Sequence, residues 1–481
     1  MIGLVIILLI LLYLVQTILI LLLEYKRPDR AAVWIFISFC LPLIGIVLYF
    51  VAGRPYSKSA RMTQEEKTLW EDMHSQISSK VKLVNSVEGM QNPSFSNNER
   101  LYNLLSEVPH SNITDCNQTD YYAEGDPLFT SLFQDIKKAE HHIHIEFYII
   151  RDDISGTRFQ DLLIKKVKEG VSVRVICDGF GSKSLPKSFM KRMKEAGVEF
   201  HVFLPPWLAL KLKKVNYRNH RKIVVIDGKI GYTGGMNIGD EYKGESTKMG
   251  FWRDTHMRMI GDAVYYLQMA FIKDWKMVTG QTLDVQHQQA LFPDHSCKGT
   301  EQVQVIESGP DENRHPIQEV CFNAIAMASS RVYITTPYFI PDIALITAIK
   351  TAARSGVDVR VLIPGKADYM MVLLASLSYL EELIEAGVTF YRYQKGFVHA
   401  KVIIVDDLLA AVGSANLDMR SFYSNFELTA VMYSKTALDR LTADFELDLQ
   451  SSIRITKGEF EKRSNLSKCG EIVCRLLSPL L

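Results

Sequence analysis

The chain has 481 residues, of which 47% are hydrophobic, enough for two or three domains with buried cores. Its 55 Lys and Arg residues nearly balance 54 Asp and Glu residues, and this formal net charge of +1 argues against a protein that binds nucleic acid through overall positive charge. Seven scattered cysteines without C-x-x-C spacing argue against a zinc site or a disulfide framework, so we expect reduced thiols.

Two apolar segments open the chain. Residues 3–23 and 31–52 are each long enough to cross ~30 Å of hydrocarbon as a helix, and the charged residues 24–30 between them predict a tight turn. We therefore predict a two-span transmembrane hairpin over residues 1–53 in a cell membrane. Cationic residues follow both spans and do not set the orientation, so only the expected reduced thiols favour a cytoplasmic catalytic region. Pro42 and Gly45 leave open a re-entrant element in place of the second span.

The remaining sequence is first polar and then repetitive. Residues 54–118 are rich in Ser, Asn and charged residues and predict a linker with a short helical portion. Beyond it, residues 170–176 and 196–200 reappear in similar form at 356–362 and 386–390. Predicted strands and helices alternate in each copy, which indicates an α/β fold. We predict two duplicated domains, 119–295 and 296–481, each with a mixed sheet flanked by helices and related by pseudo-twofold symmetry.

One motif, H-x-K-x4-D-x6-G-[GS]-x-N, occurs twice, within residues 214–241 and 393–420. The copies are displaced by 179 positions and keep every offset. A lone strand histidine is usually a structural residue, but a duplicated set at fixed spacing argues strongly for a shared site. The matching residues are His220, Lys222, Asp227 and Asn237 in the first copy and His399, Lys401, Asp406 and Asn416 in the second.

These residue types suit chemistry at a phosphodiester. Strand alternation places His220 and Lys222 on one face, and the second copy repeats this, so two half-sites together present two imidazoles and two ammonium groups to one anion. One imidazole can attack phosphorus while the other protonates the leaving alcohol and later deprotonates the incoming one. We expect no metal or other cofactor. The residues expected to hold the phosphoryl oxygens are Lys222, Lys401, Asn237, Asn416 and Ser414.

A nucleophilic imidazole also needs a partner on its other nitrogen, which fixes the tautomer. Asp254 and Glu427 each follow one motif and are the candidate carboxylates. The motif aspartates Asp227 and Asp406 end apolar strands, and we expect them to brace loop backbone or a lysine rather than contact substrate.

Two further segments have competing interpretations. His141, His142 and His144 begin a predicted strand without cysteines nearby, which favours a structural role over a metal site. Residues 205–214 place Trp207 and several leucines beside three lysines. That composition suits either an anionic membrane interface or a surface loop with a buried tryptophan.

On the two motifs the chain resembles the phospholipase D superfamily, and over its length it is similar to the bacterial cardiolipin synthase family. The similarity extends to the amino-terminal hairpin and to residues 146–148, 235–242, 252–256, 336–342 and 475–481. It implies that two phosphatidylglycerol molecules in the membrane are joined into cardiolipin with release of glycerol, through a phosphatidyl-histidine intermediate and without metal. It also implies that His220 is the nucleophile, that His399 is the general acid and base, and that Asp254 and Glu427 are their partners.

Some questions stay open at this stage. Tyr369 and Leu377 stand where the family is expected to carry histidine and arginine, which leaves the choice of acceptor open. A phospholipase D-type hydrolase or phosphodiesterase, using water or another alcohol as acceptor, is the alternative function, because the motif residues do not separate transfer from hydrolysis. A non-enzymatic scaffold would require a broken motif, and both copies are complete. The sequence predicts no oligomeric state.

Overall fold

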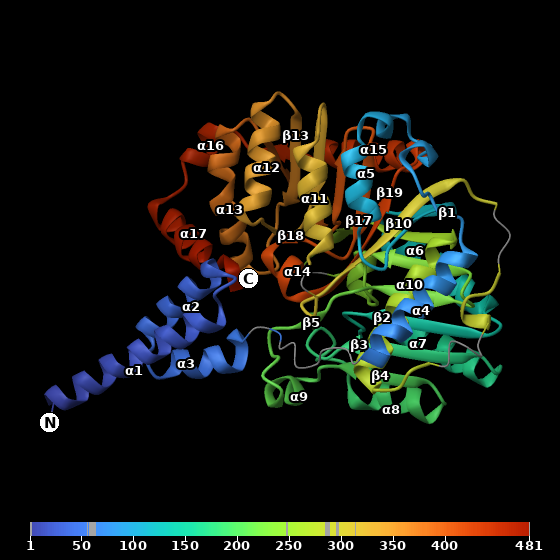
Figure 1. The fold of residues 1–481 in the computed structure, drawn as a ribbon, viewed down its shortest axis with the longest axis horizontal. Helices are drawn as coiled ribbons and strands as arrows, with labels where there is room; N and C mark the ends of the chain where they lie inside the picture. Colours follow the sequence, from blue (N-terminus) through green and yellow to red (C-terminus); the bar gives the residue numbers. More distant parts are fainter. Residues whose placement is uncertain are drawn as a thin grey trace.

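In the computed structural model, the helices of residues 2–53 form a projection that extends from a globular body of two halves (Figure 1). The structure describes residues 2–54, 56, 64–246, 249–283, 289–294, 298–312 and 314–480. The predicted domain boundary at 295/296, the start of the predicted linker and Leu481 fall wholly or partly outside these residues. The projection contains α1 (Ile2–Leu23), α2 (Pro28–Cys40), α3 (Ile44–Leu48) and the π-helical turn η1 (Tyr49–Gly53).

The first half of the body follows α4 (Gln64–Lys80), two short 3-10 turns, η3 (Val87–Gly89) and η4 (Pro93–Asn97), and α5 (Glu99–Ser106). Its strands are β1 (Ile113–Tyr122), β2 (His142–Phe147), β3 (Ser172–Asp178), β4 (Glu199–Phe203), β5 (Arg218–Asn219), β6 (Ile223–Ile226), β7 (Ile230–Gly234), β8 (Phe251–Arg253) and β9 (His256–Gly261). Its helices are α6 (Gly125–Lys138), α7 (Ile154–Lys168), α8 (Lys187–Glu195), α9 (Pro206–Lys211), the 3-10 turn η5 (Asp240–Lys243) and α10 (Ala263–Thr279).

The second half repeats this alternation after the 3-10 turn η6 (Gln289–Leu291). Its strands are β10 (Glu301–Ser308), β11 (Arg331–Thr335), β12 (Phe339–Ile340), β13 (Asp358–Pro364), β14 (Thr389–Tyr393), β15 (Gly396–Val398), β16 (Val402–Val405), β17 (Leu409–Gly413), β18 (Leu417–Asp418), β19 (Asn425–Met432) and β20 (Ser452–Arg454). Its helices are α11 (Pro316–Ala326), α12 (Ile343–Arg354), α13 (Met370–Glu385), α14 (Met419–Tyr423), α15 (Lys435–Gln450), α16 (Lys457–Glu461), α17 (Asn465–Leu477) and the 3-10 turn η7 (Ser478–Leu480).

One continuous sheet runs through both halves. Its order is β20-β14-β13-β11-β16-β17-β19-β10-β1-β9-β7-β6-β2-β3-β4, with β5 attached to β19. The halves meet where β1 pairs antiparallel with β10, and outward from this junction the strand order of one half mirrors that of the other. Pairing is parallel in β2-β3-β4 and in β11-β13-β14 and antiparallel nearer the junction. The predicted mixed sheet, helices and duplication are therefore confirmed, with the two sheets fused into one.

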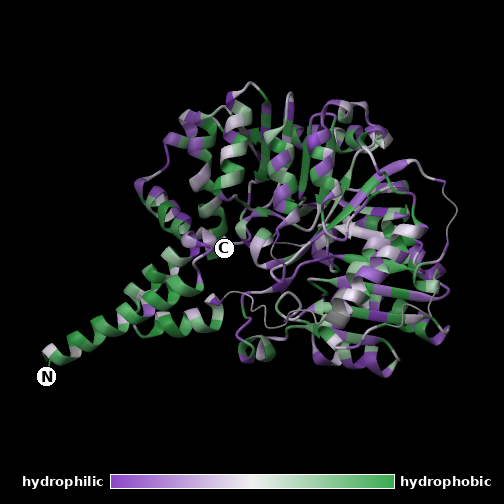
Figure 2. Cartoon of the chain, in the orientation of Figure 1, coloured by the Kyte–Doolittle hydropathy of each residue, from purple (hydrophilic) through white to green (hydrophobic). Residues whose placement is uncertain are grey.

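The projection differs from the predicted pair of spans. Within the described part of the chain, α1 is the single helix long and apolar enough to cross a membrane. The second predicted span breaks after Cys40, because Pro42 has no N–H to continue a helix, and Gln16 of α1 donates to the Pro42 carbonyl at 2.8 Å. Arg30 at the start of α2 donates to the carbonyl of Gly53 at the end of η1. The end of the segment α2-α3-η1 therefore lies next to its beginning. The predicted two-span hairpin is therefore not confirmed, and Figure 2 shows the three helices α1, α2 and α3 as largely hydrophobic.

Most of the segment predicted as a linker is folded onto the body. Trp70, Met73 and Ile77 of α4 are buried in one core with residues of α10. Phe95 and Leu101 are buried in the core of the second half. Since β1 begins at Ile113, the predicted boundary at 118/119 lies inside a strand.

One cysteine also departs from the prediction. Cys116 in β1 is disulfide-bonded, whereas Cys40, Cys177, Cys321, Cys469 and Cys474 are free. The expectation of uniformly reduced thiols is thus not met. With Cys116 in a disulfide, the cysteines no longer favour a cytoplasmic catalytic region.

Candidate active site

Two short parallel strand pairs cross between the halves and position the motif histidines. β5 pairs with the start of β19, and β15 pairs with β8. The backbone N–H of His220 donates to the Phe426 carbonyl at 2.9 Å, and that of His399 donates to the Arg253 carbonyl at 2.7 Å. Each histidine therefore lies beside the strand of the opposite half that leads into a candidate carboxylate.

Each imidazole is paired with the carboxylate of the other half. His220 Nδ1 lies 3.0 Å from both oxygens of Glu427, and His399 Nδ1 lies 2.8 Å from Asp254 Oδ2. Both carboxylates are fully buried. Because a carboxylate only accepts hydrogen bonds, each Nδ1 carries the proton, and each neutral ring presents the lone pair of Nε2. This is the tautomer that a nucleophile or a general base requires.

Burial and neighbouring charge set the protonation states. Burial lowers the pKa of His220 to about 4 although Glu427 opposes it, and burial together with Lys401 lowers the pKa of His399 to about 4. Burial alone would raise the pKa of Glu427, but His220 and Lys222 hold it at about 2. The pKa of Asp254 is also lowered, by His399 and Lys401 against the effect of burial. Near neutral pH the free site therefore contains neutral imidazoles and ionised carboxylates.

Both motif lysines are buried directly behind the imidazoles. Lys222 Nζ donates to the His220 carbonyl at 2.6 Å, and Lys401 Nζ lies 3.0 Å from His399 Nε2. Burial lowers the pKa of Lys222 to about 7 and that of Lys401 to about 8. Neither lysine is among the residues that line the cleft described below. An anion placed close to either one would favour the ammonium form.

Ser414 supports a carboxylate. Its hydroxyl donates to Glu427 Oε2 at 2.5 Å and accepts from the Leu428 N–H at 3.0 Å. We predicted a contact between Ser414 and phosphoryl oxygens; in the structure its hydroxyl is hydrogen-bonded to Glu427, and Ser414 is not among the residues that line the cleft. At the matching position, Gly235, an added Cβ would lie 2.0 Å from Asp254 Oδ1. The Asp254 carboxylate occupies the space that a side chain would need there.

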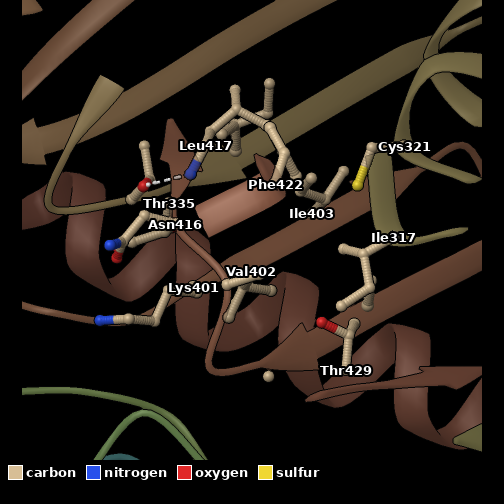
Figure 3. Close-up of a pocket in the computed structure, with 15 residues that line it drawn as sticks. Ile317, Cys321, Thr335, Lys401, Val402, Ile403, Asn416, Leu417, Phe422 and Thr429 are labelled. Carbon is tan, nitrogen blue, oxygen red and sulfur yellow. Dashed lines mark hydrogen bonds between the residues drawn. The ribbon is translucent and has the colours of Figure 1, made fainter. Parts of the chain in front are cut away.

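The two histidines open into one cleft of about 570 Å³, within the range of small-molecule sites. Asn237 and Asn416 also line it, and the Asn416 side-chain oxygen is buried without a partner among the described residues. Figure 3 shows a second, smaller cavity in the second half of the chain, where Lys401 and Asn416 lie on one side and Ile317 and Cys321 on the other. The cavity that those two residues help to line measures only about 20 Å³, room for roughly one water, and is too small for a lipid headgroup.

The motif aspartates lie at the far ends of their strands. Both have left-handed backbone conformations, with φ of 53° at Asp227 and 49° at Asp406, and neither lines the cleft. Each carboxylate accepts hydrogen bonds from three backbone N–H groups of a loop, which is the bracing of loop backbone that we predicted for these residues. The donors are Glu140, His141 and His142 for Asp227 and Ser329, Ser330 and Arg331 for Asp406.

The histidine tract of β2 is structural. His142 Nε2 and His144 Nδ1 lie 3.1 Å and 2.7 Å from the side chain of Gln268, and His144 stacks on Phe271. Across the described ranges, no group of three or more His, Cys, Asp or Glu side chains is arranged to hold a metal ion.

The motifs do not reveal several residues that line the cleft. The Tyr148 ring lies 4.8 Å from that of His220, and the Trp252 ring lies 5.1 Å from that of His399, so each imidazole has an aromatic neighbour. Arg218 and Arg420 also line the cleft. Comparison of the two motif copies could have found these arginines, because the copies differ at both positions.

Comparisons with known proteins identify the family of the chain. A family model described as "Cardiolipin synthase, PLD-like domain" matches residues 132–275 and 321–449, and one described as phospholipase D-nuclease N-terminal matches residues 4–54. The cardiolipin synthase of Alkalihalophilus pseudofirmus is 39% identical over 462 residues, which cover 95% of this chain and 90% of that protein. Cardiolipin synthase 2 of Bacillus cereus is 41% identical over 460 residues, which cover 95% and 88%.

A solved structure supports the fold. The phosphatidylserine synthase of Haemophilus influenzae Rd KW20 matches with a TM-score of 0.61 at 14% identity, covering 79% of this chain and 99% of that one. A duplicated sheet with two facing histidine-lysine pairs defines the phospholipase D class of phosphodiester-transfer enzymes. Within that class, the chain belongs to the cardiolipin synthase family. Its apolar α1 is consistent with a membrane-associated enzyme.

Proposed function

We propose that the chain transfers a phosphatidyl group from one phosphatidylglycerol to another, giving cardiolipin and glycerol. The observation that carries this proposal is the pair of neutral imidazoles in one cleft, each oriented by a buried carboxylate of the opposite half. The names of the relatives at about 40% identity support the choice of lipid.

In the first step His220 acts as the nucleophile, an assignment taken from the family order of the two motifs. Its Nε2 forms a bond to phosphorus, and the bond from phosphorus to the glycerol oxygen breaks. His399 gives a proton to that oxygen, and glycerol leaves. His399 must first gain this proton, and the phosphodiester anion favours its protonated form because opposite charge raises the pKa of an imidazole. Glu427 stabilises the positive charge that develops on His220.

The second step reverses these roles. Neutral His399 removes the proton from a glycerol hydroxyl of the acceptor phosphatidylglycerol, whose oxygen attacks phosphorus and releases His220. Lys222 and Lys401 balance the negative charge on the non-bridging oxygens in both steps, supported by Asn237 and Asn416.

A product assay tests the proposal. Purified full-length protein in mixed micelles with labelled phosphatidylglycerol is expected to release free glycerol and to form a four-chain lipid in equal amounts. Formation of phosphatidic acid alone would instead establish a hydrolase with water as acceptor.

Variants of the two histidines test the mechanism. His220→Ala and His399→Ala are each expected to abolish turnover, and the covalent intermediate is expected only when His220 is present. Appreciable turnover after either change would refute the two-histidine mechanism.

We further propose that α1 anchors the enzyme and that α9 adds a second contact with the membrane. Trp207 of α9 is 67% exposed and Leu210 is 56% exposed, so the tryptophan is not buried in a surface loop. Lys213, just after α9, lies over the Phe50 ring of η1, which brings α9 next to the projection. Deleting residues 1–53 is expected to weaken sedimentation with vesicles more than turnover, and adding Trp207→Ser is expected to remove the remainder. Full sedimentation of this double variant would contradict a role for α9.

The redox state of Cys116 in cells tests on which side of the membrane the catalytic region lies. An intact disulfide in cells places the catalytic region on the oxidising side, and a free thiol places it in the cytoplasm. Thiol labelling of acid-quenched, denatured cells, with Cys116→Ser as the control, distinguishes the two, and protease accessibility in intact spheroplasts provides an independent measurement.

A further inference from the structure

The cleft contains two arginines that the paired-histidine chemistry does not use. Arg218 stands two residues before His220, and Arg420 lies in α14 of the other half. Asn216 holds the two segments together, because Arg420 donates to its side-chain oxygen at 2.6 Å and to its carbonyl at 2.7 Å. Burial raises the pKa of Tyr148, the aromatic neighbour of His220, and both guanidiniums act against that rise. Both arginines therefore lie near the His220 end of the cleft.

The hydrogen bonds of the two guanidiniums go to neutral acceptors. Those of Arg420 go to Asn216, and Arg218 donates to the carbonyls of Val215 and Tyr217 at 2.6 Å and 2.8 Å. No carboxylate oxygen of a described residue lies within the 4.0 Å limit of an ion pair with either arginine. Burial, followed by the like charge of Arg218, lowers the pKa of Arg420.

Two buried carboxylates act on these arginines at longer range but already have other donors. Asp418 accepts from the Ser421 N–H at 2.6 Å and caps α14. Asp178 accepts from the N–H groups of Phe180, Gly181 and Asn219. Two partly buried positive charges close together, with no ion-pair partner among the residues that the structure describes, are typical of an anion-binding site before its ligand arrives.

The other half of the cleft has no matching pair. Phe397 stands two residues before His399, as Arg218 does before His220. Glu241 stands four residues after Asn237, as Arg420 does after Asn416. Glu241 also lies 3.0 Å from Arg151, so an arginine at that end is already neutralised. The positive pair is thus confined to one end of a cleft that is otherwise pseudo-symmetric.

We propose that Arg218 and Arg420 bind the phosphodiester of the acceptor lipid, an inference that rests on the proposed transfer between two phosphatidylglycerol molecules. The donor brings one phosphate, which lies between the histidines, and its leaving group is uncharged glycerol. Only the acceptor brings a second phosphate, which it keeps in the product. Holding that phosphate presents the acceptor's free hydroxyl to the phosphatidyl group on His220: the new oxygen–phosphorus bond forms, the nitrogen–phosphorus bond breaks, and His399 takes the proton.

Competition between two acceptors in one reaction tests the site. Full-length enzyme in mixed micelles receives phosphatidylglycerol and labelled free glycerol, and two products are measured: cardiolipin, and labelled phosphatidylglycerol formed by exchange. Free glycerol has no phosphate, so exchange reports formation and reversal of the intermediate without the second phosphate. The ratio of the two products does not depend on the amount of folded enzyme. The variants are Arg218→Gln and Arg420→Gln, with Arg420→Lys as a charge-conserving variant and Arg151→Gln as the matched control in the same cleft.

Both glutamine variants are expected to lower the ratio of cardiolipin to exchange by about tenfold or more, the size expected for loss of a charge-assisted hydrogen bond. Arg420→Lys is expected to recover part of the ratio, and Arg151→Gln to change it by less than about twofold, because Glu241 already neutralises that guanidinium. An unchanged ratio in both glutamine variants, or equal loss of both products in both, would overturn the site. Exchange without any cardiolipin in the unmodified enzyme would instead refute the proposed function.

Discussion

Replacing Glu427 with glutamine is expected to disable His220 while keeping the shape of the site. Glu427 is fully buried, its two oxygens lie 3.0 Å from His220 Nδ1, and both Ser414 and Asn425 donate to the same carboxylate. An amide of the same size has one acceptor oxygen and turns an NH2 group towards the remaining donors. Either His220 or its neighbours therefore lose an acceptor, and the positive charge that develops on His220 during attack loses its counterion.

The magnitude follows from this burial. Removing one partner of a buried ion pair costs about 3–5 kcal/mol, and about 1.4 kcal/mol corresponds to a factor of ten in rate. We therefore expect kcat for phosphatidyl transfer to fall by about 10²- to 10⁴-fold in Glu427→Gln. Asp254→Asn is the matched change at His399 and is expected to impair release of glycerol and attack by the acceptor.

The assay is steady-state formation of labelled cardiolipin by purified full-length protein, with the burst of glycerol measured in the first turnover. The thermal unfolding midpoint of each variant shows that the protein remains folded. If Glu427 orients the nucleophile, the burst slows together with kcat. A folded Glu427→Gln variant that retains more than about a tenth of the activity would show that the carboxylate does not act through His220.

Three further outcomes are expected. His220 and His399 are buried as neutral rings with pKa values of about 4, so below about pH 6.5 the unfolded chain binds protons that the folded chain does not. The thermal unfolding midpoint is therefore expected to drop as pH falls from about 7 to 5. A higher midpoint at about pH 5 would contradict this. Lys222 and Lys401 lose their charge as pH rises through about 7 and 8, so inhibition by inorganic phosphate is expected to weaken between about pH 6.5 and 9. An inhibition constant that does not change with pH would argue against these lysines as the anion site. Asp406→Ala is expected to lower the unfolding midpoint by several degrees while kcat of the folded enzyme stays within about threefold; lost activity at unchanged stability would assign Asp406 a chemical role.

The sequence could predict the chemistry of the site because the chemistry is duplicated. Fixed offsets pointed to both histidines and both lysines, and the carboxylates could be proposed because an imidazole nucleophile needs an acceptor on Nδ1. The crossing of these pairs between the halves could not be predicted. It depends on β5 lying against β19 and β15 against β8, contacts between segments 207 and 145 residues apart (425 − 218 and 396 − 251) that leave no local pattern.

Other differences also have physical causes. The Ser414 hydroxyl contacts Glu427 because the register of β17 against β19 brings the two side chains together, and this register could not be predicted from the sequence. The break at Pro42 depends on Gln16 as an outside donor. The packing of α4 rests on a few apolar residues, Trp70, Met73 and Ile77, at helical spacing in an otherwise polar segment. That spacing was visible in the sequence and could have indicated a buried helix face.

Each motif histidine is paired with a carboxylate of the other half, and this pairing has a consequence for the history of the chain. A single half would hold a histidine without its acceptor, whereas two copies of one half, related by a twofold axis, would complete each other. The arrangement therefore points to a symmetric dimer of a shorter ancestor that was later joined into one chain. In a dimer of identical subunits every substitution changes both half-sites at once. In one chain the two halves can differ, as Asp254, Gly235 and Glu241 differ from Glu427, Ser414 and Arg420, so the two ends of the cleft can receive different molecules.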